Sequence, residues 1–275
     1  MDRLKEKVAV ITGAGSGIGQ YTAVLFAQEG AKVVVADVNE EGGRETVRQV
    51  EAAGGEALFV KTDVSKMADC RELVARTVER FGKLDVLFCN AGLIGHTQYD
   101  IGHQSEEIFD RFCAVNFKGV WNTIHCAAAE LVKSRGSIVN TCSAAATVGN
   151  YGCTIYGTTK GAVLTLTLSV ANELAPYGVR CNCISPYTAL TPGVIKTMNP
   201  QKEAIFHEGN PMHRLINVHD IAYTVLFLAS DEARCVNGVD IRVDCGANIQ
   251  GQPIVMETFF ENNPYEGKIP YQFDM

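Results

Sequence analysis

Tyr156 and Lys160 are the two residues whose types and spacing could perform acid–base chemistry. They stand four positions apart in a strongly helical stretch, so both side chains would lie on one helix face and reach a common point. A free phenol has a pKa of about 10, which is too high for a good base at neutral pH. A fixed ammonium group beside it would stabilise the phenolate and lower that pKa. The pair predicts a proton donor and acceptor, although the same spacing is also common on exposed helix faces.

Two further polar residues accompany this pair. Ser143 follows a predicted strand over 137–141 and precedes Tyr156, and Asn116 lies in an earlier helical stretch. Because Ser143 and Asn116 occur together with the Tyr-x-x-x-Lys pattern, a chance match of that pattern is less plausible. The candidate catalytic set is therefore Asn116, Ser143, Tyr156 and Lys160.

A glycine-rich stretch, Thr12–Gly19, comes directly after the apolar run Val8–Ile11. A β-branched run, then glycines, then helical spacing of apolar residues predicts a strand, a tight turn and the start of a helix. Glycines let a ligand approach the backbone closely, and the first amides of a helix favour an anion. The stretch predicts a pyrophosphate site formed by Gly13, Ser16, Gly17, Ile18 and Gly19.

Asp37 closes the next predicted strand, over 31–36, at the spacing from Gly17 at which dinucleotide folds bind the adenine-side ribose. A carboxylate there accepts both ribose hydroxyls of NAD and repels a 2′-phosphate. Val38 follows it, and the glycine turn contains no Arg or Lys. These residues favour NAD over NADP, with a surface Asp that caps the next helix as the alternative.

The elements that must position these residues alternate regularly between strand and helix. This cadence predicts one α/β domain, a single-domain Rossmann fold with a doubly wound parallel sheet of seven strands and helices on both faces. Ligands in such sheets bind at the carboxyl ends of the strands. The predicted strands cover 8–11, 31–36, 57–60, 84–88, 137–141, 179–184 and 239–243.

The composition limits which kinds of binding partner are plausible. Of the 275 residues, 47% are hydrophobic and 20% are charged, which is typical of a globular protein with a substantial core. The net charge of −7, with Lys and Arg spread along the chain, argues against nucleic acid and anionic membranes as partners. We expect a small-molecule substrate and a cytoplasmic location, since no stretch resembles a membrane span or signal peptide.

The metal-ligating residue types give no recognisable motif. The ten cysteines show no zinc-type pairing, and the six histidines show no paired spacing. We therefore expect reduced cysteines that lie mostly in the core, and no metal site.

The motifs together resemble those of the short-chain dehydrogenase/reductase family, over residues 1–246. The glycine spacing is that family's pattern, and no frame gives Gly-x-Gly-x-x-Gly because position 18 is Ile. Several independent motifs occur in the family's order. They are Thr12-Gly13-x-x-x-Gly17-x-Gly19, Asp63, Asn90-Ala91-Gly92, Asn116, Ser143, Tyr156-x-x-x-Lys160, and Pro186 with Thr191.

This resemblance implies a role for each catalytic candidate. Tyr156 would transfer the proton on the substrate oxygen, and Ser143 would hydrogen-bond that oxygen. Lys160 would lower the pKa of Tyr156 and bind the nicotinamide ribose, while Asn116 would support a water that relays the proton. The hydride would pass between the substrate carbon and the nicotinamide.

The resemblance also implies a set of cofactor contacts. Asp63 and Val64 would bracket the adenine, 90–92 the inner ribose, and Thr191 the carboxamide. The full set expected to bind the cofactor is Gly13, Ser16, Gly17, Ile18, Gly19, Asp37, Val38, Asp63, Val64, Asn90, Ala91, Gly92, Tyr156, Lys160, Pro186, Thr188 and Thr191.

Substrate contacts are expected from Ser143, Tyr156, Tyr187 and His96. Tyr187 replaces the Gly that commonly follows Pro186 in the family, and simple packing is its alternative role. His96 lies in a loop, 93–103, that would overhang the pocket or form plain surface. We expect residues 186–217 to form a mobile flap and the aromatic tail, 247–275, to pack on the body or a neighbouring subunit.

The leading functional hypothesis is an NAD-dependent oxidoreductase that interconverts a secondary alcohol and a ketone, on a cyclic or steroid-like substrate. The alternatives are an NADPH-dependent carbonyl reductase, a related epimerase or dehydratase, and a catalytically silent NAD-binding regulator. Two helical stretches, 120–131 and 153–177, are apolar on more than one face. Because the family pairs these helices between subunits, the resemblance implies a homodimer or homotetramer.

Overall fold

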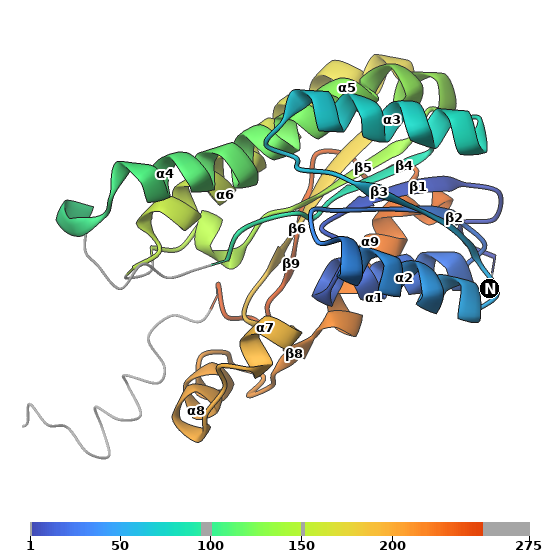
Figure 1. Cartoon of the computed structure of the whole chain (residues 1–275). Helices are drawn as coiled ribbons and strands as arrows, with labels where there is room; N and C mark the ends of the chain where they lie inside the picture. The colour runs from blue at the N-terminus through green and yellow to red at the C-terminus, as the bar shows by residue number, and fades with distance from the viewer. Residues whose placement is uncertain (1, 95–100, 150–151, 250–275) are drawn as a thin grey trace, which may run out of the picture.

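The computed structural model describes residues 2–94, 101–149 and 152–249 (Figure 1). Its centre is a parallel sheet of seven strands in the order β3-β2-β1-β4-β5-β6-β9. This confirms the predicted sheet, with strand ends that differ by up to a few residues. The strands are β1 (Val8–Thr12), β2 (Lys32–Asp37), β3 (Glu56–Lys61), β4 (Val86–Cys89), β5 (Ser137–Thr141), β6 (Arg180–Pro186) and β9 (Asp240–Val243).

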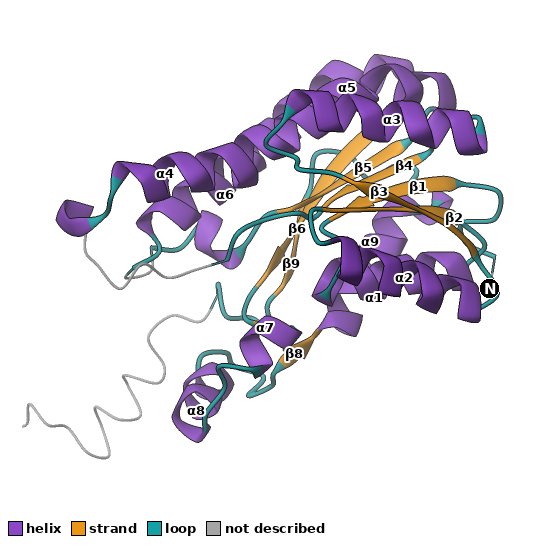
Figure 2. Cartoon of the chain, viewed as in Figure 1, coloured by secondary structure: helices purple, strands orange, loops and turns teal. Residues whose placement is uncertain are grey.

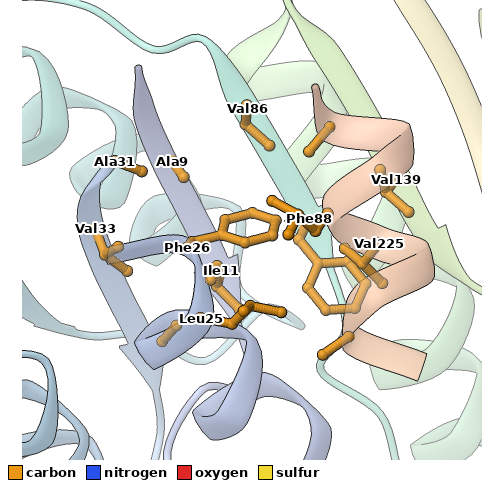
Figure 3. Close-up of a cluster of buried hydrophobic side chains, with 14 of the residues drawn as sticks. Ala9, Ile11, Leu25, Phe26, Ala31, Val33, Val86, Phe88, Val139 and Val225 are labelled. Carbon is orange, nitrogen blue, oxygen red and sulfur yellow. The ribbon is translucent and has the colours of Figure 1, made fainter. Parts of the chain in front are cut away.

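Helices cover both faces of the sheet, as predicted (Figure 2). One face carries α1 (Gly17–Gln28), α2 (Glu40–Ala52) and α9 (Val218–Ala229), and the other carries α3 (Met67–Phe81), α5 (Gly119–Ser134) and α6 (Thr154–Leu174). Within β1, Ile11 packs toward the first layer and Val10 toward the second, because strand side chains alternate between faces. Figure 3 shows Phe26 of α1 and Val225 of α9 meeting Phe88 of β4 in the first layer.

The chain between β4 and β5 contains one continuous helical run. Helix α4 (Glu106–Phe112) continues through a π-helical segment, η2 (Cys113–Lys118), directly into α5. Backbone angles at Phe112, Lys118 and Gly119 are all helical, so no break separates the elements. The wider π turn contains Asn116, and such turns frequently occur at functional sites.

The segment 186–217 is built from short helices and strands. Two short strands, β7 (Ala189–Leu190) and β8 (Ile216–Asn217), pair in parallel, and between them lie α7 (Pro192–Ile195) and α8 (Pro200–Glu208). These elements lie apart from the two helical layers (Figure 1). We call this part of the chain, residues 186–217, the flap segment.

Five short helical turns complete the described elements: η1 (Ile101–His103), η2, η3 (Ala144–Ala146), η4 (Ala175–Tyr177) and η5 (Asp231–Ala233). Within the described ranges, no helix is both long enough and apolar enough to cross a membrane.

Candidate active site

The amino end of α1 is open toward the carboxyl edge of the sheet. Its N-cap residue, Ser16, makes no side-chain hydrogen bond to the helix, and the first turn contains no acidic residue. By contrast, Asn39, Asn199 and Asn217 each cap a helix with a side-chain oxygen. The first amides of α1 are thus left for an external acceptor, and an anionic group would satisfy them.

The glycines of this turn are required by close packing. A Cβ on Gly19 would lie 2.3 Å from the Gly13 carbonyl oxygen, and one on Gly13 would lie 2.7 Å from Cα of Ala91. Gly13 and Gly17 also have positive φ values, 65° and 58°. Larger residues would fill the cradle or strain its backbone, so the turn fits the close approach of a phosphate. Ile18, which follows Gly17, packs partly buried against the core.

Asp37 faces the glycine turn from the end of β2. Its Oδ2 accepts a hydrogen bond from the Gly15 amide at 2.8 Å, and its Oδ1 accepts one from the Asn39 amide at 2.8 Å. Val38 is exposed beside it. Helix α2 is capped by Asn39 rather than by Asp37, which removes the main alternative role for this carboxylate.

Two α2 residues that sequence reasoning missed support the turn from behind. The buried Thr46 hydroxyl donates to the Ala14 carbonyl at 2.8 Å, and Gln20 of α1 donates to that hydroxyl at 3.0 Å. Gly42 packs so closely that a Cβ would lie 2.5 Å from the Gly15 carbonyl oxygen. In the sequence, the Gly42-Gly43 pair indicates that α2 packs closely on a neighbouring element. No sequence pattern indicates that Thr46 supports the turn.

Asn90 joins β4 to the same turn. Its Nδ2 donates to the carbonyl oxygens of Thr12 and Gly13, both at 3.1 Å. The Thr12 hydroxyl in turn accepts from the Asn90 and Ala91 amides, at 3.0 and 3.1 Å. Gly92 follows, and a Cβ there would lie 3.6 Å from Nζ of Lys160. The 90–92 motif therefore lies between the glycine turn and the catalytic candidates.

Asp63 and Val64 lie after β3 and make mostly structural contacts. Asp63 Oδ1 accepts from the Ser65 hydroxyl at 2.6 Å. Partial burial raises its pKa, but hydrogen bonds from Ser65 and Lys66 outweigh burial and leave the pKa lowered. Val64 is buried, and its carbonyl accepts from Nδ2 of Asn122 in α5 at 2.9 Å. Adenine contact by these two residues stays a prediction.

Ser143 and Tyr156 come together beyond the carboxyl end of β5. Ser143 is buried and precedes η3, its Oγ accepts from the Ala145 amide at 3.2 Å, and it lies near enough to Tyr156 to affect the pKa of the phenol. Burial is the largest effect on Tyr156 and raises its pKa, while Ser143 acts in the opposite direction. We expected Lys160 to lower this pKa; in this structure the net shift is upward because desolvation disfavours the phenolate.

Lys160 lies one helical turn from Tyr156, as the spacing predicted. Its side chain is 4% exposed, and Nζ donates to the Thr141 carbonyl at 2.7 Å. The ammonium lies 5.8 Å from the centroid of the Tyr156 ring. Burial lowers the pKa of Lys160 to about 8, because desolvation disfavours the charged ammonium form.

Asn116 is fully buried in the π turn and fastens the segment after β4. Its Oδ1 accepts from the Leu93 amide at 2.7 Å, and its Nδ2 donates to the Leu93 carbonyl at 3.0 Å. Nδ2 also lies 3.4 Å from the Thr159 hydroxyl of α6. Asn116 thus links the 90–92 motif to the Tyr156 helix, and the predicted water relay stays a prediction.

The flap segment meets the glycine turn at one point. A Cβ on Gly17 would lie 3.4 Å from Cγ2 of Thr191, whose Oγ1 caps α7. Pro186 is the last residue of β6, and Thr188 is half-buried after it. Tyr187 is half-buried against the core, and a Cβ on Gly209 would lie 2.7 Å from its hydroxyl. Packing by Tyr187 is therefore established, and substrate contact stays a prediction.

Two predicted features lie wholly or mostly outside the described residues. His96 falls within 95–100, and the tail is described only as far as Ile249. The tail begins against the site, because Asn248 Nδ2 donates to the Thr147 hydroxyl at 2.9 Å, close to η3. No motif in the sequence marks this contact.

The site occupies the carboxyl edge of a doubly wound sheet, with an open helix terminus at one end and a Ser-Tyr-Lys cluster at the other. This arrangement defines the class as an oxidoreductase with a Rossmann fold, and comparison with known proteins agrees. The family model described as "Enoyl-(Acyl carrier protein) reductase" matches residues 13–248. Secoisolariciresinol dehydrogenase of Forsythia intermedia is 38% identical over 253 residues, which cover 90% of this chain and 91% of that protein.

Solved structures are similar over nearly the whole length. Levodione reductase is 33% identical with a TM-score of 0.86, and the match covers 90% of this chain and 100% of that one. A 7α-hydroxysteroid dehydrogenase in complex with NADH and 7-oxo glycochenodeoxycholic acid is 32% identical with a TM-score of 0.84, covering 89% and 95% of the two chains. The protein belongs to the short-chain dehydrogenase/reductase family.

Proposed function

We propose that the protein is an NAD-dependent alcohol dehydrogenase and ketone reductase that uses Tyr156 as its acid and base. The observation that carries this proposal is that Ser143 lies near enough to Tyr156 to affect the pKa of its phenol, with the buried Lys160 one helical turn away. Two hydroxyls and one cation converge there at the carboxyl edge of the sheet. A catalytically silent regulator would have no need to bury an ammonium group at this position, where burial is costly.

The residues of this chain divide the proton chemistry between them. Ser143 and Tyr156 present two hydroxyls to one substrate oxygen. Burial keeps Tyr156 protonated at neutral pH, so it is ready to donate a proton to a carbonyl oxygen during reduction. During oxidation, the phenolate must be stabilised, and Lys160 is the cation one helical turn away. A bound nicotinamide cofactor would supply the hydride transfer.

The glycine turn and Asp37 support NAD as that cofactor. The open amides of α1 fit a pyrophosphate, and the Asp37 carboxylate stands against Gly15, where a 2′-phosphate would meet a negative charge. The similarity to a hydroxysteroid dehydrogenase solved with NADH supports the same choice. The predicted contacts of 63–64, 90–92, Pro186, Thr188 and Thr191 are part of this proposal.

We propose a cyclic or steroid-like secondary alcohol as the substrate, bound by Ser143, Tyr156, Tyr187 and His96. The named relatives support this class, because secoisolariciresinol, levodione and 7-oxo glycochenodeoxycholic acid are all cyclic compounds. Tyr187 stands directly after β6 and would present its ring to such a substrate. Residues 1–246 form the proposed catalytic domain.

The assembly and location are also proposals. Trp121 of α5 and Leu168 of α6 are 43% and 50% exposed, which supports a homodimer or homotetramer formed through these helices. The ten cysteines form no disulfide within the described ranges, which supports a reducing compartment such as the cytoplasm.

The decisive experiment has two stages. First, NADH and NADPH are titrated separately against the protein, with cofactor fluorescence as the readout; we expect NADH to bind at least tenfold more tightly. Second, secondary alcohols, sugars, hydroxysteroids and bile acids are screened with NAD for a rise in NADH absorbance. Tighter binding of NADPH would overturn the cofactor proposal, and binding of NADH with no turnover on any alcohol or ketone would favour the regulator.

A further inference from the structure

A cluster of metal-ligating side chains lies on the flap segment, away from the proposed catalytic residues. His207 and Glu208 end α8, and His213 follows a short turn. Each residue offers one ligand atom, and the three atoms lie within 4.8 Å of one another. The sequence spacing of these residues matches no metal motif, so only the turn brings them together.

The distances within the cluster suit a small cation after modest movement. Nδ1 of His213 lies 3.6 Å from Oε2 of Glu208, and the two imidazole rings stack with their centroids 6.2 Å apart. Ligand atoms around a tetrahedral zinc ion, with bonds near 2.0–2.1 Å, are about 3.4 Å apart. The side chains of Glu208 and His213 are 60% and 55% exposed, so they are free to close around an ion.

The turn that faces the two histidines toward each other is held by a buried amide. Asn210 is 0% exposed, and its Nδ2 donates to the carbonyls of Phe206 and Arg214 at 2.9 and 3.0 Å. Its Oδ1 accepts from the Arg214 amide at 3.2 Å. His213 has a φ of 45°, a left-handed conformation that costs energy for a residue with a Cβ. The fold therefore pre-organises the cluster.

Two cationic side chains near the cluster, Arg214 and Lys202, bind other partners than Glu208. Arg214 pairs with Asp220 at 3.7 Å, and Lys202 donates to the Thr197 carbonyl at 3.0 Å. Glu208 faces His213 instead. A bound cation would therefore supply the positive charge that faces this carboxylate.

We propose that His207, Glu208 and His213 bind one divalent transition-metal ion of the zinc class. Two imidazoles and one carboxylate suit zinc, nickel and copper, whereas magnesium and calcium prefer oxygen ligands alone. Three protein ligands leave at least one position for water. The ion would join the end of α8 to the chain after the turn, and Gly209 between them packs on Tyr187, so occupancy would brace the flap segment beside the proposed pocket.

The test measures binding of ZnCl₂ alone, by titration calorimetry on the full chain without an affinity tag and without nicotinamide cofactor. Cys235 is an exposed thiol, so all proteins carry Cys235→Ser. We expect one zinc ion per chain with micromolar affinity, and no displacement by millimolar Mg²⁺. His207→Ala and His213→Ala should each weaken binding tenfold or more, while His219→Ala on α9, an exposed histidine outside the cluster, should not.

The outcomes separate this proposal from the proposed function, because the titration needs no catalysis. A lack of saturable binding would overturn the metal site, as would equal affinity in the His207→Ala and His213→Ala proteins. Circular dichroism must show that both variants remain folded. If either variant fails to fold, Glu208→Gln provides the second test: it keeps the shape and removes the charge, and unchanged affinity in this variant would also overturn the proposal.

Discussion

The carboxylate of Asp37 accepts a hydrogen bond from the Gly15 amide at 2.8 Å, which ties the end of β2 to the centre of the glycine turn. One side chain thus both shapes the turn and places a negative charge beside it. Asp37→Asn separates the two contributions in part, because the amide keeps one oxygen to accept from the Gly15 amide but loses the charge and the bond from the Asn39 amide.

Asp37→Asn should narrow the preference for NADH over NADPH by about tenfold or more, equivalent to about 1.4 kcal/mol. The repulsion of a 2′-phosphate is lost, while the Gly15 bond can persist. Dissociation constants for both cofactors, from fluorescence titration, measure the change. Glu41→Gln on α2 is the control, since it removes an exposed charge from the same region. An unchanged preference in Asp37→Asn would place selectivity elsewhere.

Thr46→Val should weaken NADH binding and lower the free energy of unfolding by about 1–2 kcal/mol. The substitution keeps the volume but removes the hydroxyl that binds the Ala14 carbonyl and accepts from Gln20. Denaturant unfolding and cofactor titration provide the two readouts. Thr158→Val is the matched control, because that exposed hydroxyl bonds only within its own helix. Equal effects in the two variants would contradict a supporting role for Thr46.

Tyr156→Phe should reduce turnover by about 10²–10⁴-fold and change the dissociation constant of NADH little. The hydroxyl whose pKa Ser143 lowers is removed, while the half-buried ring remains. Steady-state kinetics and cofactor fluorescence measure the two effects. Tyr177→Phe at an exposed position is the control. Turnover retained within tenfold would rule out Tyr156 as the proton donor.

Lys160→Met should gain stability relative to the wild type at pH 7 and lose most of that gain by pH 10. The pKa of Lys160 falls from 10.5 to about 8 in the folded protein. Below pH 8 the folded protein therefore carries the full cost of a buried charge, about 3 kcal/mol. As pH rises from 8 toward 10.5, Lys160 loses its proton in the folded wild type at a lower pH than in the unfolded chain. The destabilisation caused by the buried charge therefore disappears over this range.

Unfolding free energies of the wild type and of Lys160→Met, measured from pH 7 to pH 10, test whether the stability difference depends on the ionisation of Lys160. The difference between them should change by about 2 kcal/mol. Parallel curves would show that the Lys160 pKa is not lowered in the folded protein.

Leu168→Glu should shift the protein toward smaller species in light scattering at micromolar concentration. The substitution places a charge on the exposed apolar face of α6 that we propose as an interface. Ile205→Glu, which alters an exposed apolar residue on α8, is the control. A wild-type protein that is monomeric at this concentration would contradict the proposed oligomer outright.

Local patterns were sufficient to predict much of this protein from its sequence. Alternation of apolar runs and helical spacing predicts the seven strands and both helical layers, because each element must bury one face or stripe. Four-residue spacing places Tyr156 and Lys160 on one helix face, since helical neighbours are fixed by the helix itself. The role of the glycines in the first turn is predictable for a similar reason, because glycine is the residue that adopts positive φ values and allows close backbone packing.

Tertiary packing decided the contacts between segments distant in the chain. Asp37 meets Gly15, Thr46 meets Ala14, and Asn116 fastens Leu93 only because separate elements dock at one edge of the sheet. Burial, which raises the pKa of Tyr156 and lowers that of Lys160, is likewise a property of the whole fold. Electrostatic environment depends on everything packed around a group, and spacing along the chain cannot specify it.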